Sequence, residues 1–315
     1  MTLLIGTDEA GYGPNLGPLV VAATAWRADH APDAVDGAVA AAAAAAWNAP
    51  PDPLWADSKT IYRAGAGFAA LERGVHAALL VLHGAAPDAW PRLEALLGPI
   101  GPEAGAAVEG PTLEALELPR AADPAECRRR AAAAAAALDG AGLALVGSAC
   151  RAIHPGDFNR LLDAGLNKSD ILSRTTLDLA AALLGRHGPD EAVVWCDRHG
   201  GRKRYAALVA RHFAAPLVQP LEETQARSAY LAPAARLRVE FSVGGEARLP
   251  VALASMAAKY VRELAMEAFN AFWCDRVPGL AATAGYPVDA RRWRAAAAPA
   301  IHAAGLPLEE VWRRA

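Results

Sequence analysis

The chain has 315 residues, 54% of them hydrophobic, and a formal net charge of −3 at pH 7. This length predicts one large domain or two smaller ones, at roughly 100–200 residues per domain. The near-neutral charge excludes overall basicity as a means of binding nucleic acid, so any polyanion site requires a local basic patch. Much of the hydrophobic fraction is alanine, which favours helices but buries little surface.

The four cysteines form no C-x-x-C pair, and in a chain of this length they predict reduced thiols rather than a disulfide framework or a zinc site. The segment from Met1 to Asp8 has no basic residue and reaches an acid too early for a signal peptide. No run of about 18 apolar residues is both unbroken and richer than alanine, so we expect no transmembrane helix. These features predict a cytoplasmic protein with no membrane partner.

The first half of the chain mixes strands and helices. Apolar residues predict a strand over 3–7 and a second, paired strand over 17–26. The other expectations are, in order, an alanine-rich helix over 33–47, a loop opened by residues 57–59, a helix over about 65–82, and an irregular insertion or small subdomain over 84–124.

The second half alternates more regularly. The expected elements are, in order, a helix over 124–138, a strand over 143–150, a helical stretch from 154, a helix over 169–186, a strand over 192–196, a helix over 202–213, a short strand over 216–219, a strand over 236–243, a helix over 250–273 and one or two terminal helices. The apolar run at 192–196 is typical of a strand buried on both faces. The mixture predicts an α/β protein with a mixed central sheet.

Two adjacent carboxylates, Asp8 and Glu9, end the first predicted strand and precede a glycine-rich loop. Neighbouring residues on a strand point to opposite faces, so one of the two faces inward or lies at the strand end. A buried carboxylate is costly unless it is paired or holds a metal, and a hard cation such as Mg²⁺ takes oxygen ligands. The alternative is a solvated acidic turn after an edge strand.

Two further carboxylates follow predicted strands. Asp197 comes directly after the strand at 192–196, at the end where open α/β sheets place their sites, although an Asp there also suits a helix cap. Glu246 precedes the helix at Pro250, where a helix dipole alone would stabilise it. If Asp8, Glu9, Asp197 and Glu246 meet at one sheet edge, two Mg²⁺ or Mn²⁺ ions about 4 Å apart would offset their repulsion and drive phosphodiester hydrolysis.

Six segments in order resemble type 2 ribonuclease H, that is, ribonuclease HII and its relative ribonuclease HIII. They are Asp8 to Pro14 with Gly17 to Ala22, Asp57-Ser58-Lys59, 167–179, 193–197, Ala254 to Lys259, and Gly285-Tyr286-Pro287. The resemblance implies a ribonuclease H-like fold over most of the chain, except residues 84–124 and about the last 20. It divides the chain into a catalytic domain over 1–275 and a C-terminal helical extension over 276–315.

The family consists of metal-dependent endonucleases that cut the RNA strand of RNA–DNA hybrids, including single ribonucleotides embedded in DNA. By resemblance, Asp8, Glu9 and Asp197 match the first three metal-binding acids. The fourth is an Asp placed ten residues before the serine that Ser255 matches; Gly245 has that spacing here, and we assign the role to Glu246, one residue later. The resemblance implies two Mg²⁺ or Mn²⁺ ions bridged by Asp8, and products with 5′-phosphate and 3′-hydroxyl ends.

The residues expected to bind substrate lie in five segments. They are Gly11, Tyr12 and Gly13; Ser58 and Lys59; Arg202, Lys203 and Arg204; Ser255 and Lys259; and Tyr286. The first segment replaces the family's G-R-G loop, so the arginine is lost, while the glycine amides remain able to approach a phosphate or sugar.

The run from Arg198 to Arg204 is the best local basic patch. Its alternative, a solvated basic helix start, is disfavoured because cations near a helix N-terminus oppose the dipole. We expect a nucleic-acid partner and no obligate protein partner. Two other functions stay open: a nuclease of the same fold acting on a DNA junction, flap or structured RNA, and a non-catalytic nucleic-acid-binding module.

Overall fold

A single seven-stranded sheet forms the centre of the protein. The computed structural model describes residues 1–47, 53–62, 67–98, 110–188 and 191–314. The strands are β1 (Thr2–Ala10), β2 (Leu19–Ala28), β3 (Leu143–Ile153), β4 (Glu191–Asp197), β5 (Gln219–Glu223), β6 (Arg227–Ala232) and β7 (Leu237–Ser242).

The sheet is mixed, with the order β3-β2-β1-β4-β7-β6-β5. Strands β1, β4 and β7 run parallel to one another in the middle, and the remaining neighbours pair antiparallel. The prediction of an α/β protein with a mixed central sheet is confirmed. The parallel centre matters for function, because its strands deliver their carboxyl ends to the same edge.

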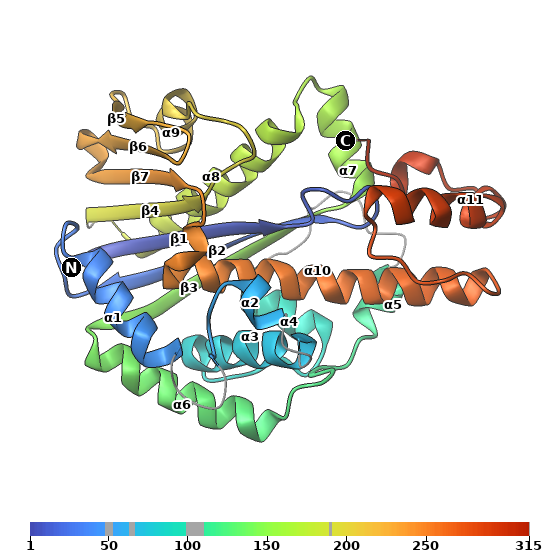
Figure 1. Ribbon diagram of the computed structural model, residues 1–315, viewed down its shortest axis with the longest axis horizontal. Coiled ribbons are helices and arrows are strands. Elements are labelled where there is room, and N and C mark those ends of the chain that lie inside the picture. Colours follow the sequence, from blue (N-terminus) through green and yellow to red (C-terminus); the bar gives the residue numbers. More distant parts are fainter. Residues whose placement is uncertain (48–52, 63–66, 99–109, 189–190, 315) are drawn as a thin grey trace.

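Helices cover both faces of the sheet (Figure 1). One face carries α1 (Val35–Trp47), α3 (Gly67–His83), α4 (Trp90–Leu97), α6 (Pro124–Gly140) and the long α10 (Leu249–Arg276), and the other carries α7 (Pro155–Asp163), α8 (Lys168–His187) and α9 (Ala206–His212). Residues of β1 alternate between the two cores: Leu4 packs with the α10 side, and Leu3 and Ile5 pack with the α8 side. Both faces of β1 are therefore buried, as its apolar composition requires.

The last helix lies beyond the sheet. Helix α11 (Pro287–Ala303) packs on the final turns of α10 through a third apolar cluster that includes Phe269, Trp273 and Trp293. The chain then returns toward α7 (Figure 1). The division into a catalytic domain and a C-terminal extension stays a prediction.

Several expected elements differ from those observed. Residues 84–124 contain α4 and α5 (Gly110–Glu114), both packed on the main core, while 99–109 lie outside the described residues. Residues 57–59 do not form a loop: α2 (Ser58–Tyr62) begins there because Asp57 Oδ1 accepts a hydrogen bond from Lys59 N–H (2.8 Å). Strand β6 went unpredicted, β5 begins later than expected, and α9 begins at Ala206 rather than at 202.

All four cysteines are free thiols, and Cys127, Cys150 and Cys196 are buried. No helix within the described ranges is long and apolar enough to cross a membrane.

The absence of a side chain at Gly6 lets α10 approach β1 closely. A Cβ at Gly6 would overlap the Pro250 carbonyl carbon and the Val251 nitrogen. The start of α10 is also bound to β2, where Thr24 Oγ1 donates to Pro250 O (2.7 Å). This approach fixes the direction in which α10 runs past the end of β1.

We expect Gly6→Ala to lower the free energy of unfolding by roughly 3 kcal/mol, since backbone atoms would have to move to relieve the overlap. The control is Gly37→Ala in α1, where a Cβ meets nothing within 4 Å. This control should stabilise the protein by about 0.5–1 kcal/mol. Urea denaturation of both variants measures the difference, and equal midpoints would contradict this role of Gly6.

Candidate active site

The four predicted acids lie at the carboxyl ends of the three parallel strands. Thr7 of β1 pairs with Cys196 of β4, so the next residues, Asp8 and Asp197, are neighbours on adjacent strands. Asp197 in turn pairs with Ser242 of β7. After β7 the chain turns into the short 3₁₀ helix η2 (Gly245–Ala247), which carries Glu246. Gly245 N–H donates to Asp197 Oδ1 (3.1 Å), which holds η2 against β4.

Asp8 is the most enclosed of the four acids. Its side chain is on the same face as Leu4, toward α10, and the residue is only 5% exposed. Asp8 Oδ1 accepts a hydrogen bond from Glu9 N–H (2.8 Å), whereas Oδ2 is buried and has no hydrogen-bond partner among the described residues. An unpartnered buried carboxylate oxygen is costly, which indicates a missing ligand.

Burial and mutual repulsion raise the pKa values of the first two acids. Burial raises the pKa of Asp8 well above its usual range, and the charges of Glu9, Asp197 and Glu246 raise it further, while Ser255 lowers it. Burial likewise raises the pKa of Glu9 to about 8, with added repulsion from Asp197 and Glu246 and a lowering effect from Lys59. The four carboxylates therefore act as one electrostatic cluster, which we call the acid cluster (Asp8, Glu9, Asp197 and Glu246).

Neighbouring groups partly oppose the rise in pKa of the other two acids, Asp197 and Glu246. Burial raises the pKa of Asp197, and the backbone N–H of Gly245 opposes that shift. Burial also raises the pKa of Glu246, although Lys59 Nζ lies 3.0 Å from Glu246 Oε1. Among the predicted substrate residues, Lys59 thus forms an ion pair with the acid cluster, and a side-chain hydrogen bond from Ser255 lowers the pKa of Asp8.

The donor set fits a hard divalent cation. It consists of carboxylate oxygens, it includes the unpartnered Asp8 Oδ2, and its repulsion would fall when cations bind. Within the part of the chain that the structure describes, no three His, Cys, Asp or Glu side chains are already arranged as a ligand set. The chemistry of the donors therefore fits the ion.

Helix α10 places Ser255 beside the acid cluster and Lys259 beyond it. Ser255 is buried and its hydroxyl donates to Ser58 Oγ (3.0 Å), which links α10 to the start of α2. Lys259, one turn later, points elsewhere: its Nζ lies 3.4 Å from Glu263 Oε1 and 4.2 Å from the centroid of the Tyr62 ring. The Lys259 ammonium is thus paired outside the acid cluster, and its expected contact with substrate stays a prediction.

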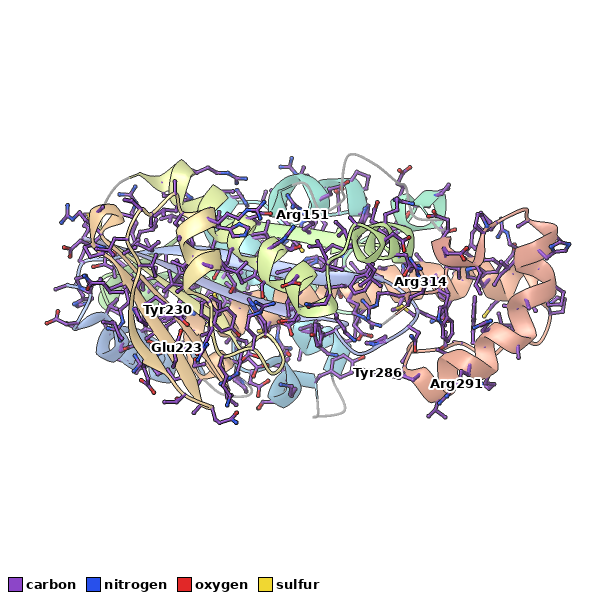
Figure 2. The ribbon with its side chains drawn as sticks, turned by 90° about the horizontal axis from the view of Figure 1, so that it is seen from above. Arg151, Glu223, Tyr230, Tyr286, Arg291 and Arg314 are labelled. Atoms are coloured by element: carbon purple, nitrogen blue, oxygen red, sulfur yellow. The ribbon has the colours of Figure 1, made fainter. Side chains whose placement is uncertain are left out.

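The loop Gly11-Tyr12-Gly13 directly follows the acids. Gly11 has φ +83°, a conformation that favours glycine. Lys168 Nζ lies over the Tyr12 ring, 4.6 Å from its centroid. Gly13 lies next to the ring of Tyr286. Tyr286 directly precedes α11, as Figure 2 shows, and it is 57% exposed. The structure thus brings Tyr12 and Tyr286 to the same loop.

The basic run from Arg198 to Arg204 is less available for binding phosphate than the sequence indicates. Arg198 is buried and donates to Thr224 O (3.1 Å), and burial lowers the pKa of His199 to about 3, so this imidazole is neutral. Arg202 pairs with Asp170 and donates to Ser169 Oγ (3.1 Å).

The two remaining cations of the run are exposed. Lys203 and Arg204 lie before α9, and Arg204 Nε is 3.7 Å from Glu223 Oε2. Arg204 directly precedes Tyr205, the N-cap of α9, so both cations lie just outside this seven-residue helix.

Sequence reasoning missed three cations around the loop: Lys168, Arg262 and Arg313. Arg262 and Arg313 are buried, and both lie against backbone near Gly11. Arg313 is 302 positions from Gly11, to which it donates, and a separation of that size leaves no sequence pattern. Lys168, by contrast, lies within the segment 167–179 that resembles the family.

No family model matches the chain, and no curated protein matches it. Solved structures similar to it include the PCNA–RNase HII complex from Archaeoglobus fulgidus (16% identity, 98% of this chain, 93% of that chain, TM-score 0.43). Ribonuclease H2 from Pyrococcus horikoshii OT3 aligns at 15% identity over 98% of this chain and 92% of that chain, with a TM-score of 0.42. Bst-RNase HIII in complex with Mn²⁺ aligns at 16% identity over 99% of this chain and 66% of that chain, with a TM-score of 0.41.

These are structures of the two enzymes that the sequence motifs resemble. A likeness of this size transfers no role to any residue here.

Proposed function

We propose that the protein is a metal-dependent endonuclease of the ribonuclease H type that hydrolyses the RNA strand of RNA–DNA hybrids or cuts at ribonucleotides embedded in DNA. The observation that carries the proposal is the acid cluster, four carboxylates at or just after the ends of parallel strands, where burial and then mutual repulsion raise the pKa of Glu9 to about 8. A cluster of this kind is costly to the fold, and divalent cations offset the cost. The ordered motifs around it favour a ribonucleotide substrate.

Asp8, Glu9, Asp197 and Glu246 are the residues that would hold the ions. Two divalent cations would supply a water nucleophile and stabilise the charge on the leaving 3′-oxygen. The protein holds the carboxylates on rigid strand ends, and burial of Asp8 excludes bulk water from the centre of the cluster.

Substrate contacts are proposed from both sides of the acid cluster. Lys59 is two-thirds exposed at its side chain and neutralises Glu246, so it is placed to meet a phosphate next to the ions. Across the cluster, the loop of Gly11 to Gly13 offers backbone amides, and Tyr12 and Tyr286 offer aromatic rings for a sugar or base. The partner is therefore a nucleic acid.

A labelled duplex panel tests the proposal. We expect cleavage of a duplex with one embedded ribonucleotide and of a full hybrid in Mg²⁺ or Mn²⁺, and no cleavage of either in EDTA. All-DNA duplex should stay intact. Cleavage of all-DNA would favour a junction or flap nuclease, and failure to cut any duplex together with no Mn²⁺ binding in calorimetry would favour a non-catalytic module.

A further inference from the structure

The C-terminal tail, residues 307–314, is bound to the loop that follows the acid cluster. Arg313 N–H donates to Asn15 O (2.8 Å), and the Asn15 side-chain amide donates to Arg313 O (2.9 Å). Trp312 forms an antiparallel bridge with Leu16. From the other side, the Asn159 amide donates to Glu309 O and Trp312 O, each at 2.8 Å. The tail is thus fixed between α7 and the loop.

The Arg313 side chain lies fully buried beneath the loop. Its Nη2 donates to Gly11 O (2.6 Å), to Tyr12 O (3.4 Å) and to Pro14 O. The guanidinium carbon lies 4.8 Å from the centroid of the Phe158 ring. Its Nε and Nη1 are buried and have no hydrogen-bond partner in the described ranges.

Among the described residues, the contacts of the buried Arg313 guanidinium include no carboxylate. The hydrogen bonds of Arg313 go to backbone carbonyls, and a second buried arginine, Arg262, donates to Ala284 O (3.1 Å) close to Gly11. Burial and the charge of Arg262 lower the pKa of Arg313 to about 9. A neutral donor would suffice to bind the carbonyls of a turn, so a buried charge with no carboxylate partner within the described ranges favours an anionic ligand.

The carbonyl contacts also set the direction of the loop amides. In a trans peptide the C=O of one residue and the N–H of the next point in opposite directions. Since the carbonyls of Gly11 and Tyr12 point at Arg313, the N–H groups of Tyr12 and Gly13 point away from it. Successive backbone N–H groups of this kind form a concave site for anions. Tyr12 itself carries no charge, so the cations beside the loop come from other segments.

We propose that Arg313 is a positioning residue for the substrate. It holds the loop of Gly11 to Pro14 so that the backbone amides point outward, and a phosphate of the nucleic acid binds to these amides. The positive charge of Arg313 lies on the opposite side of the loop from that phosphate and attracts it. The inference rests on the proposed function and extends it. A loop without its own cation thereby acquires one from the far end of the sequence.

The test compares Arg313→Met with Arg314→Met, the same change at the next residue, whose guanidinium is half-exposed and pairs with Asp163 (2.6 Å). Hydrogen exchange of the peptide spanning residues 9–18 reports the loop. Fluorescence anisotropy with the embedded-ribonucleotide duplex, in Ca²⁺ to prevent cleavage, reports binding. For Arg313→Met we expect faster exchange confined to that peptide, duplex binding weakened by about tenfold, and unchanged Mn²⁺ binding. Arg314→Met should match the wild-type protein in all three measurements.

Unchanged exchange and unchanged duplex binding in Arg313→Met would overturn the inference, as would equal losses in Arg314→Met. If the loop loosens but the wild-type protein neither binds nor cuts any duplex, the proposed function fails and the nucleic-acid role of Arg313 fails with it, while its support of the loop stands. Should Arg313→Met not fold, Arg313→Lys keeps the charge without the planar fork, and it should show the same localised rise in exchange.

Discussion

Asp8→Asn should abolish metal-dependent cleavage and, at the same time, stabilise the metal-free protein. Cleavage should fall by at least roughly a thousandfold, because several kcal/mol of transition-state stabilisation depend on the ions and each 1.4 kcal/mol is a factor of ten. The gain in stability has a different origin: the raised pKa of Asp8 shows that its ionised form is costly in the folded state.

The sign of this gain depends on pH. A carboxyl whose pKa is raised on folding destabilises the protein above its unfolded pKa, and the cost grows until the pH reaches the folded pKa. In EDTA at pH 8, Asp8→Asn should therefore melt above the wild-type protein by about 2 °C or more, and the difference should vanish near pH 4. Differential scanning calorimetry at both pH values gives the comparison.

The matched control is Asp178→Asn, the same change at a half-exposed carboxylate that pairs with His212 on the α8–α9 surface. This variant should cleave at the wild-type rate and gain no stability at pH 8. An Asp8→Asn protein that still cuts the embedded-ribonucleotide duplex would refute the assignment of the site. An Asp8→Asn protein that is inactive but less stable in EDTA would refute the account of repulsion in the acid cluster.

Divalent metal binding should be strongly pH-dependent and should release protons. Metal ligation requires ionised carboxylates, and the Glu9 pKa of about 8 means that this group holds a proton at neutral pH without metal. One such proton makes the association constant rise tenfold per pH unit well below the pKa, so Mn²⁺ affinity should increase by about fiftyfold from pH 6 to pH 8 and level off above that.

Calorimetric titration in buffers of different ionisation enthalpy counts the released protons directly. We expect at least one proton per protein molecule at pH 7, and a smaller number for Glu9→Gln. Mn²⁺ affinity that is constant between pH 6 and pH 8 would show that the carboxylates are already ionised, and would remove the electrostatic basis of the site.

The placement of acids at strand ends could be predicted because strand ends are local features of the sequence, while their catalytic role stays a prediction. The apolar runs before Asp8 and Asp197 predicted β1 and β4, and parallel strands bring their carboxyl ends together. Strand periodicity alone did not identify Glu246. Its spacing differs by one residue from that of the expected acid, and η2 places it beside Lys59. Which strands are neighbours is decided by long-range pairing, which periodicity does not report.

Other features were hidden because their causes are tertiary. The run at 202–204 looked like a helix start, but Tyr205 is buried against Phe241 and α9 begins only after it. Arg198 satisfies loop carbonyls near β6, a strand that the sequence reading missed. Arg313 acts on a loop from the opposite end of the chain, and a charged residue near a chain end is usually exposed.

Helix α10 has a mechanical consequence for any duplex bound at the acid cluster. It is one unbroken helix of 28 residues, and its early turns pack on β1 while Phe269 and Trp273 pack on α11. From Ser255 to Trp273 it spans about 27 Å, at 1.5 Å per residue. Because a helix resists bending, the C-terminal extension keeps a fixed distance from the carboxylates. This distance between the proposed active site and α11 equals about eight nucleotide steps of a duplex at 3.4 Å per step.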